Sequence, residues 1–153
     1  MPKVTPRTRK EAKVLHGAMV DLYALMSQPQ RDDTLLREAG VALDRALFPL
    51  LVGIERYGPV GVVDLADRAG RDHTTVSRQV SKLESLGLVE RQPSAADRRI
   101  NEAVITPKGR TVTDALDAAR WRLAAPILAK WSEEDFGNLV RLFRRFVDDL
   151  LEL

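Results

Sequence analysis

Two helices joined by a three-residue turn limit the possible folds of this chain more than any other feature. Apolar spacing predicts the first helix over Val62–Ala69 and the second from His73 to just before Gly87. The turn begins with Gly70, where the first helix stops, and it ends with Asp72, whose carboxylate can cap the second helix. This arrangement is typical of a helix-turn-helix.

One face of each helix is apolar, and the pair therefore predicts a small core. The apolar side chains recur three or four positions apart, which places them on one side of each helix. Gly87 fits a left-handed residue that ends the second helix, with Leu88 packed back on that helix. The side chains expected to face inward are Leu65, Ala66, Ala69, Val76, Val80 and Leu83.

The opposite face of the second helix carries short hydroxyls and long cations, without the Glu and Lys alternation of an ordinary solvated helix. Hydroxyls and cations hydrogen-bond phosphates and base edges, and Arg78 can bind a guanine through two parallel hydrogen bonds. The composition favours a surface that binds DNA, although a solvated surface rich in Ser and Thr has the same pattern. The candidate DNA-binding residues of this helix are Thr74, Thr75, Ser77, Arg78, Ser81 and Lys82.

A β-hairpin is predicted after the second helix. Strand-forming residues occupy Leu88–Gln92 and Ile100–Thr106, and the connection between them is rich in turn residues. Asp97, Arg98 and Arg99 lie at or near the tip. Adjacent arginines on a projecting tip suit the narrow, electronegative minor groove of DNA. The alternative is a surface turn whose Asp–Arg pair contributes little.

These residues resemble the MarR family of winged helix-turn-helix regulators, specifically over residues 58–110. The matching segments, in order, are Leu65-Ala66, Thr75-Val76-Ser77-Arg78, Leu83-Glu84 with Gly87-Leu88-Val89, Asp97-x-Arg99, and Thr106-Pro107-x-Gly109. The resemblance implies a homodimer on double-stranded DNA, with a recognition helix of each subunit in successive major grooves. It also implies that Arg99 enters the minor groove, that Asp97 orients it, and that Arg98 contacts a nearby phosphate.

The 153 residues suit one domain with an oligomerising extension, mainly α with a small antiparallel β-hairpin wing. N- and C-terminal helices would form the dimerisation region of this winged helix-turn-helix. We divide the chain into a flexible basic arm (1–10), an N-terminal dimerisation helix and loop (11–42), the DNA-binding domain (43–109) and C-terminal dimerisation helices (110–153).

Three prolines indicate irregularities in the flanking helices. Pro29 lies in a loop expected over 28–33. Pro49 either kinks its helix or marks the place where the regular part of that helix begins. Pro126 is expected to bend or stop the C-terminal helix near Ala125.

Both terminal regions have apolar faces that the DNA-binding domain does not need. Both faces become buried if the two regions pack together and against the same elements of a second chain. We expect this arrangement because two-fold dimers are the commonest assemblies. Such a dimer places two recognition helices about 34–36 Å apart, one turn of DNA. A monomeric helical bundle is the alternative.

Positive charge is concentrated in the segment predicted to bind DNA. Residues 68–110 hold nine Lys or Arg against five Asp or Glu, although the net charge of the chain is only +2.

The rest of the composition excludes several other classes of protein. The chain has no cysteine, so a disulfide or thiol switch is impossible. His16 and His73 fall in no metal-binding or catalytic spacing, so we expect no enzyme, no metal and no cofactor. No apolar run suits a membrane span or a signal peptide, and we expect a cytoplasmic protein without a membrane partner.

The overall prediction is a sequence-specific transcriptional regulator that binds a pseudo-palindromic site on DNA. The resemblance favours a repressor over an activator. The resemblance also implies release from DNA by a small aromatic or anionic effector. Met19, Tyr23 and Phe48 are the candidate pocket residues, although all three also suit an ordinary core. The alternative is a winged-helix module that binds a protein partner, for which exposed apolar residues would be expected on the second helix.

Overall fold

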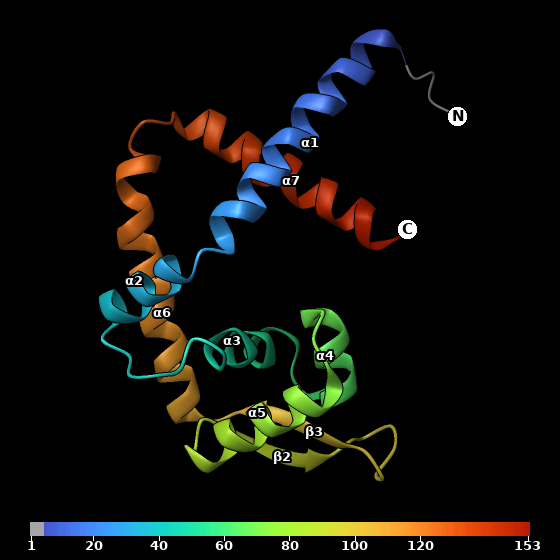
Figure 1. Cartoon of the computed structure of the whole chain (residues 1–153), viewed down its shortest axis with the longest axis vertical. Helices are drawn as coiled ribbons and strands as arrows, with labels where there is room; N and C mark the ends of the chain where they lie inside the picture. The colour runs from blue at the N-terminus through green and yellow to red at the C-terminus, as the bar shows by residue number, and fades with distance from the viewer. Residues whose placement is uncertain (1–4) are drawn as a thin grey trace.

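The computed structural model describes residues 5–153, and it places the helix-turn-helix and the two terminal helices at opposite ends of the molecule (Figure 1). Helix α6 runs between the two ends (Figure 1). The helices are α1 (Pro6–Met26), α2 (Pro29–Ala39), α3 (Phe48–Tyr57), α4 (Val62–Ala69), α5 (His73–Ser85), α6 (Pro107–Leu128) and α7 (Glu133–Leu151). The strands are β1 (Val60–Gly61), β2 (Val89–Pro93) and β3 (Asn101–Ile105).

The caps of α5, the second helix of the helix-turn-helix, are those that the sequence predicts. Asp72 caps its start, because the carboxylate oxygen Oδ2 accepts a hydrogen bond of 2.8 Å from the backbone N–H of Thr75. Gly87 has a φ of 73°, and the N–H of Leu88 donates to the carbonyl of Leu83 at 3.0 Å. These bonds form a Schellman end and fix where the chain turns toward the wing.

The apolar face of α5 is confirmed as the centre of the core. Val76, Val80 and Leu83 are fully buried and pack with residues of α3, α4 and the sheet. The expectation that Ala69 faces inward is wrong, since this residue is exposed. The last turn of α4 lies at the rim of a surface hollow beside Pro49, so Ala69 borders solvent.

The wing is the hairpin β2–β3, and a third strand that the sequence analysis did not predict completes the sheet. The strand order is β1-β3-β2, all antiparallel, with Val60 opposite Ala103 and Val89 opposite Ile105. Strand β1 contains only two residues, which is too short to show the alternation that marks a strand. It nevertheless buries Val60 and fastens α4 to the hairpin.

The N-terminal helices start earlier than the sequence predicts. Helix α1 begins at Pro6, inside the segment 1–10 that was expected to be a flexible arm, and the first four residues of that arm lie outside the described residues. The Oγ1 atom of Thr5 accepts from the N–H of Thr8 at 3.1 Å, and Pro6 has a φ suited to a first helical turn. Pro29 likewise begins α2, so the loop expected over 28–33 is wrong.

The two remaining prolines behave differently. Pro49 lies in the first turn of α3, where its missing N–H removes no helical hydrogen bond, so the regular helix does begin there. Pro126 does not stop α6 near Ala125, because the helix continues to Leu128. Only the last turn follows this proline, and the loss of one backbone bond so close to the end is tolerated.

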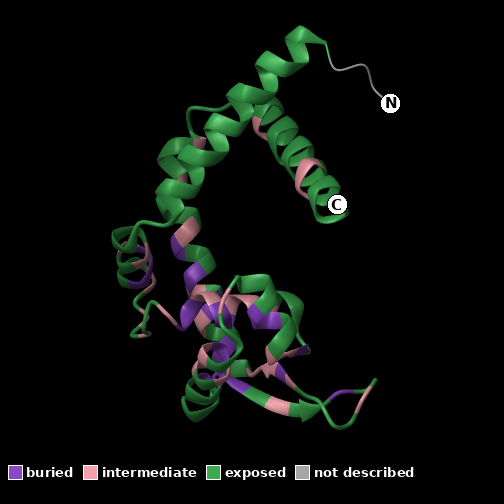
Figure 2. Ribbon diagram, turned by 45° about the vertical axis from the view of Figure 1, so that its right-hand side comes forward, coloured by how far each residue is buried: buried purple, intermediate pink, exposed green. Residues whose placement is uncertain are grey.

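Buried residues are concentrated in the half of the molecule that contains the helix-turn-helix (Figure 2). A second apolar cluster joins Leu35 and Leu36 of α2 to Phe48, Leu116 and Ala119. Helices α1 and α7, in contrast, contain no buried residue at all. Their apolar faces are therefore not satisfied by contacts within one chain.

Candidate nucleic-acid interface

The outward face of α5 leaves most of the predicted DNA-binding side chains accessible. Thr74, Arg78 and Lys82 are exposed, while Thr75 and Ser77 are half-buried at the edges of this face. Within residues 5–153 the guanidinium of Arg78 donates no hydrogen bond and forms no ion pair. Its five N–H donors are thus available for a ligand outside the chain.

Ser81 differs from the other residues of this face because the protein itself uses its hydroxyl. The Oγ atom donates to the carbonyl of Ser77 at 3.0 Å and accepts from Nη2 of Arg91 at 2.9 Å. One acceptor lone pair remains for DNA. Ser81 is therefore better placed to hold the neighbouring strand than to read a base.

Arg91 is a residue of this site that the sequence analysis missed. It lies on β2, and besides Ser81 it donates from Nε to Oε2 of Glu84 at 3.2 Å. These two bonds fasten the wing to the recognition helix. The partners are seven and ten residues away along the chain, a separation that no local pattern reveals.

The start of α5 is held by two carboxylates. The hydrogen bond from the Thr75 N–H, followed by that from its side chain and the nearby His73 and Arg78 charges, lowers the pKa of Asp72 below the ordinary value of 3.8. Nε2 of His73 lies 2.9 Å from Oδ1 of Asp67, which links α4 to the first turn of α5. His73 thus pairs with a carboxylate of the protein itself.

The wing tip brings together the three residues that the sequence singled out. Arg99 donates from Nε and Nη2 to the two carboxylate oxygens of Asp97, at 3.0 and 2.9 Å, and its backbone N–H donates as well. These side-chain bonds, more than the backbone bond, lower the pKa of Asp97, and they raise the pKa of Arg99. The side chain of Arg99 is still 89% exposed, so its charge projects from the hairpin. Arg98 beside it is also exposed.

The first turn of α6 is clamped to the turn that follows α5. Thr106 caps α6 by accepting from the N–H of Gly109 at 3.0 Å, and its Oγ1 donates to the carbonyl of Gly87 at 2.6 Å. The N–H of Thr106 also donates to the carbonyl of Leu88 at 3.1 Å. A side chain at Gly109 would collide with that same carbonyl, so only glycine permits this approach.

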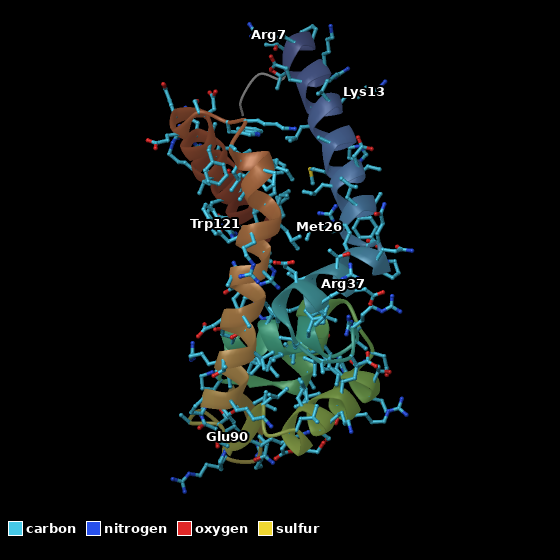
Figure 3. All side chains as sticks on the ribbon, turned by 90° about the vertical axis from the view of Figure 1, so that its left-hand side faces the viewer. Arg7, Lys13, Met26, Arg37, Glu90 and Trp121 are labelled. Carbon is cyan, nitrogen blue, oxygen red and sulfur yellow. The ribbon has the colours of Figure 1, made fainter. Side chains whose placement is uncertain are left out.

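The structure does not gather the three predicted effector residues in one pocket. Met19 and Tyr23 lie together on α1 and, with Phe143 of α7, line a cavity of about 420 Å³. Phe48 is only 5% exposed and borders a different hollow between α2 and α6. Figure 3 shows side chains on both sides of α1: Lys13 projects away from α6, whereas Met26 projects toward it.

A helix-turn-helix followed by an antiparallel wing, with free cations on both, defines the class of winged helix-turn-helix DNA-binding proteins. The model of the MarR family matches residues 43–100. The HTH-type transcriptional regulator YxaD of Bacillus subtilis (strain 168) is 31% identical over 110 residues, which cover 69% of this chain and 77% of YxaD. The chain therefore belongs to the MarR family of transcriptional regulators.

Solved structures agree on the fold. A MarR family protein from Bacillus stearothermophilus has a TM-score of 0.71 at 20% identity, covering 92% of this chain and 97% of that protein. The MarR of Staphylococcus aureus, in complex with salicylate and kanamycin, has a TM-score of 0.69 at 15% identity and covers 95% of this chain and 96% of its own. Among residues 5–153, no helix is both long enough and apolar enough to cross a membrane.

Proposed function

We propose that this regulator is a homodimeric repressor that binds a pseudo-palindromic site on double-stranded DNA. In each subunit α5 enters the major groove, where Thr74, Thr75, Ser77 and Arg78 contact base edges and Lys82 a phosphate. Arg99 enters the adjacent minor groove, oriented by Asp97. The observation that carries the proposal is the exposed guanidinium of Arg78, which has no partner among residues 5–153 and lies on a face rich in hydroxyl groups.

Ser81 and Arg98 have supporting roles in this proposal. The hydroxyl of Ser81 keeps one lone pair toward the groove while it holds Arg91 of the wing. Arg98 is exposed next to Arg99 and reaches a phosphate at the edge of the minor groove.

The dimer is supported by the apolar side chains of the terminal helices. Large hydrophobic residues of α1, α6 and α7 are exposed in the single chain, and an exposed apolar surface of this extent marks an interaction site. A second copy presents the same helices and satisfies both faces at once. This arrangement places the two recognition helices about 34–36 Å apart.

Release by a small ligand is the regulatory part of the proposal. The structure of the Staphylococcus aureus MarR contains salicylate, an aromatic anion. A ligand changes DNA affinity only if it binds more tightly to one arrangement of the two recognition helices than to another. Met19 and Tyr23 remain candidates at the junction of α1 and α7, whereas buried Phe48 serves the core.

Selection of bound sites from a random duplex pool tests the DNA-binding proposal. We expect a two-fold symmetric site with A·T-rich flanks where Arg99 would lie, because A·T-rich minor grooves are narrow and electronegative. Gel shifts at two salt concentrations should show a steep loss of affinity with salt. An unenriched pool together with salt-independent binding would instead favour a winged helix that binds a protein.

A further inference from the structure

Three basic side chains lie together on the first turns of α1, at the end of the molecule opposite to α5 (Figure 1). Arg9 and Lys13 are four positions apart, so they project from the same side of the helix, and Lys10 lies at the edge of that side. All three are exposed. We call these three residues the α1 cations.

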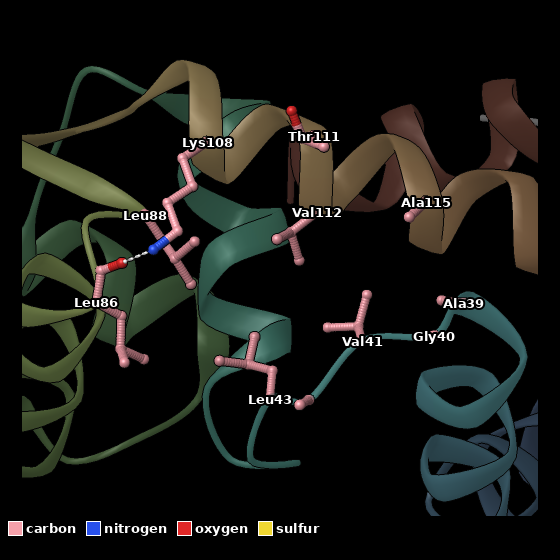
Figure 4. Close-up of a pocket in the computed structure, with 11 residues that line it drawn as sticks. Ala39, Gly40, Val41, Leu43, Leu86, Leu88, Lys108, Thr111, Val112 and Ala115 are labelled. Atoms are coloured by element: carbon pink, nitrogen blue, oxygen red, sulfur yellow. Dashed lines mark hydrogen bonds between the residues drawn. The ribbon is translucent and has the colours of Figure 1, made fainter.

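The α1 cations are not neutralised by the chain itself. Among residues 5–153 none of the three forms an ion pair, whereas Arg7 beside them donates from Nε to Oε1 of Glu11 at 2.9 Å. Lys108 is a contrasting case, because its Nζ donates to the carbonyl of Leu86 at 2.8 Å and holds α6 to the turn after α5 (Figure 4). The charge of the α1 cations is thus available for a partner.

Positive charge is concentrated in two segments of the chain. Residues 1–16 hold five Lys or Arg against one Glu, and residues 68–110 hold nine against five Asp or Glu. The rest of the chain holds ten Lys or Arg against sixteen Asp or Glu. Because the second segment contains the proposed DNA-binding face, the α1 cations belong to a separate basic surface at the other end of the molecule (Figure 1).

This basic surface points away from the apolar side of α1. Leu22 follows Lys13 by nine positions and therefore lies on the opposite side of the helix, where it lines a cavity with Phe143 of α7. Lys13 projects away from α6 (Figure 3). The proposed dimer uses the apolar side, so the α1 cations stay exposed in the dimer as well.

We propose that the α1 cations bind the phosphate backbone of a second DNA duplex. Arg9 and Lys13 are about 6 Å apart along the helix axis. Phosphates two steps apart on one DNA strand are separated by about 6.8 Å along the duplex axis, so the two cations match them. No hydroxyl or amide side chain accompanies the α1 cations on this side of the helix, so we expect binding without sequence preference.

DNA suits this surface better than a membrane does. A helix that lies on a bilayer inserts its apolar side, and the apolar side of α1 faces α7 instead. In addition, a dimer that is bound to its site through α5 meets neighbouring DNA at high effective concentration.

A dimer with both surfaces bridges two duplexes. Helix α6 contains 22 residues, so it is about 33 Å long, and it separates α1 from α5. A straight duplex in contact with α5 therefore does not reach the α1 cations, which remain free for another duplex. The bridging role rests on the proposed function, whereas the binding of DNA by the α1 cations does not.

A capture assay with the full chain tests the proposal. Duplex that carries the selected site is immobilised, saturated with protein and washed, and a fluorescent random duplex is then added. We expect the protein to retain this second duplex at about 50 mM salt and to release it at about 200 mM, because phosphate contacts weaken steeply with salt. If no second duplex is retained at the lower salt concentration, the proposal is overturned.

Two variants with equal losses of charge locate the second surface. The charge variant carries Arg9→Gln, Lys10→Gln and Lys13→Gln. The control carries Arg31→Gln, Arg37→Gln and Lys130→Gln, which remove exposed cations outside both DNA-binding surfaces. Gln has nearly the same helix propensity as Arg and Lys, so α1 should stay folded. The charge variant should retain at least about tenfold less second duplex and bind the selected site unchanged, and the control should behave like the original chain. Equal capture by the two variants would overturn the proposal.

Vesicles of phosphatidylglycerol and phosphatidylcholine in equal parts distinguish DNA from a membrane. At equal phosphate concentration the vesicles should not displace the captured duplex. Displacement would overturn DNA as the partner of the α1 cations.

Gel shifts with random duplex keep this proposal distinct from the proposed function. Arg78→Ala with Arg99→Ala weakens the α5 and wing surface, and the remaining low-salt binding should fall further when the α1 cations are replaced as well. No further fall would overturn the second surface. A chain that binds its selected site but captures no second duplex overturns the second surface and leaves the regulator intact. A chain that binds random duplex through the α1 cations but selects no site upholds the second surface and overturns the regulator.

Discussion

Arg78 is the side chain on which sequence discrimination is expected to depend most. Its guanidinium is exposed and unpaired among the described residues, so the folded chain gives up no internal bond when it binds a base. Arg78→Ala should cost about 1–3 kcal/mol of binding per half-site and relax specificity at one base position. Competition gel shifts with the selected site and with random duplex measure both effects.

Arg37→Ala is the matched control, because it removes an exposed arginine of α2 far from α5. It should leave both the affinity and the specificity ratio unchanged. If Arg78→Ala weakened binding to the selected and random duplexes equally, Arg78 would contact a phosphate rather than a base.

Asp72 predicts an acid-sensitive start of the recognition helix. Its pKa is lower in the folded chain than the ordinary 3.8, chiefly because the Thr75 N–H donates to the carboxylate. The ionised cap therefore stabilises the fold above pH 3.8, and this contribution is lost as the pH falls through the lower pKa of the folded chain.

Asp72→Asn keeps a hydrogen-bond acceptor at this position but cannot titrate. Urea unfolding should show the original chain more stable than Asp72→Asn at neutral pH, with the difference shrinking as the pH falls below the ordinary value of 3.8. A difference that stays constant would contradict the argument.

At the scale of elements, α6 lies so close to the turn after α5 that position 109 has no room for a side chain. Gly109→Ala places a methyl group against the carbonyl of Leu88, and we expect a loss of about 1–3 kcal/mol in the free energy of unfolding. Gly137→Ala on α7 meets no atom within 4 Å and should be stabilising by roughly 0.5–1 kcal/mol. Urea denaturation of both variants gives the comparison. Equal effects would mean that α6 does not approach the turn so closely.

The link between the wing and the recognition helix is a second element-scale prediction. Glu84→Gln removes a negative charge near the proposed DNA-binding face. If the two side chains acted only through their charges, the effects of Glu84→Gln and Arg91→Met on the free energy of DNA binding would add. If Arg91 positions the wing through Glu84 and Ser81, the two effects should be non-additive, with a coupling of about 0.5–1 kcal/mol in DNA binding. Dissociation constants of the two single variants, the double variant and the original chain complete the cycle. Strict additivity would remove Arg91 from a positioning role.

The elements that the sequence predicts well are those that local rules determine. Asp72 and Gly87 mark the start and the end of the second helix through their own side chain or backbone, and the structure confirms both. Thr106 and Pro107 begin α6 by the same local rules. The contacts of Arg91 could not be predicted, since its partners lie on another element. The two residues of β1 form a strand only because β3 is already beside them.

The sequence alone did not decide whether Pro6 and Pro29 begin a helix or lie in a loop, because the answer depends on contacts with other parts of the chain. Pro6 and Pro29 can mark either a loop or the first turn of a helix, and the choice depends on the preceding residue and on the packing of the turns that follow. Thr5 supplies the cap before Pro6, whereas Gln28 before Pro29 adopts an extended conformation without a side-chain bond. The position of Phe48 in the core likewise depends on α2, which begins at Pro29 inside the segment expected to be a loop.

At the scale of the whole molecule, DNA affinity is expected to depend on the apolar terminal helices. Phe143 is 46% exposed on α7 and lines a cavity with residues of α1. Phe143→Asp should produce monomers in sedimentation experiments and reduce affinity for the symmetric site at least about tenfold, because the two half-sites would bind independently. Asn138→Asp introduces the same acidic group elsewhere on α7 and should remain dimeric. A Phe143→Asp protein that stayed dimeric would place the interface elsewhere.

Helix α6 has a geometric consequence for this assembly. It contains 22 residues and is therefore a rod of about 33 Å, with its first turn locked to the end of the recognition helix by Thr106 and Lys108. If the far end acts as a pivot, a tilt of about 5° moves the locked end by about 3 Å. The base pairs of DNA are spaced about 3.4 Å apart. In the proposed dimer, a change of a few degrees in how the two subunits lean together would thus move each recognition helix by nearly one base-pair step.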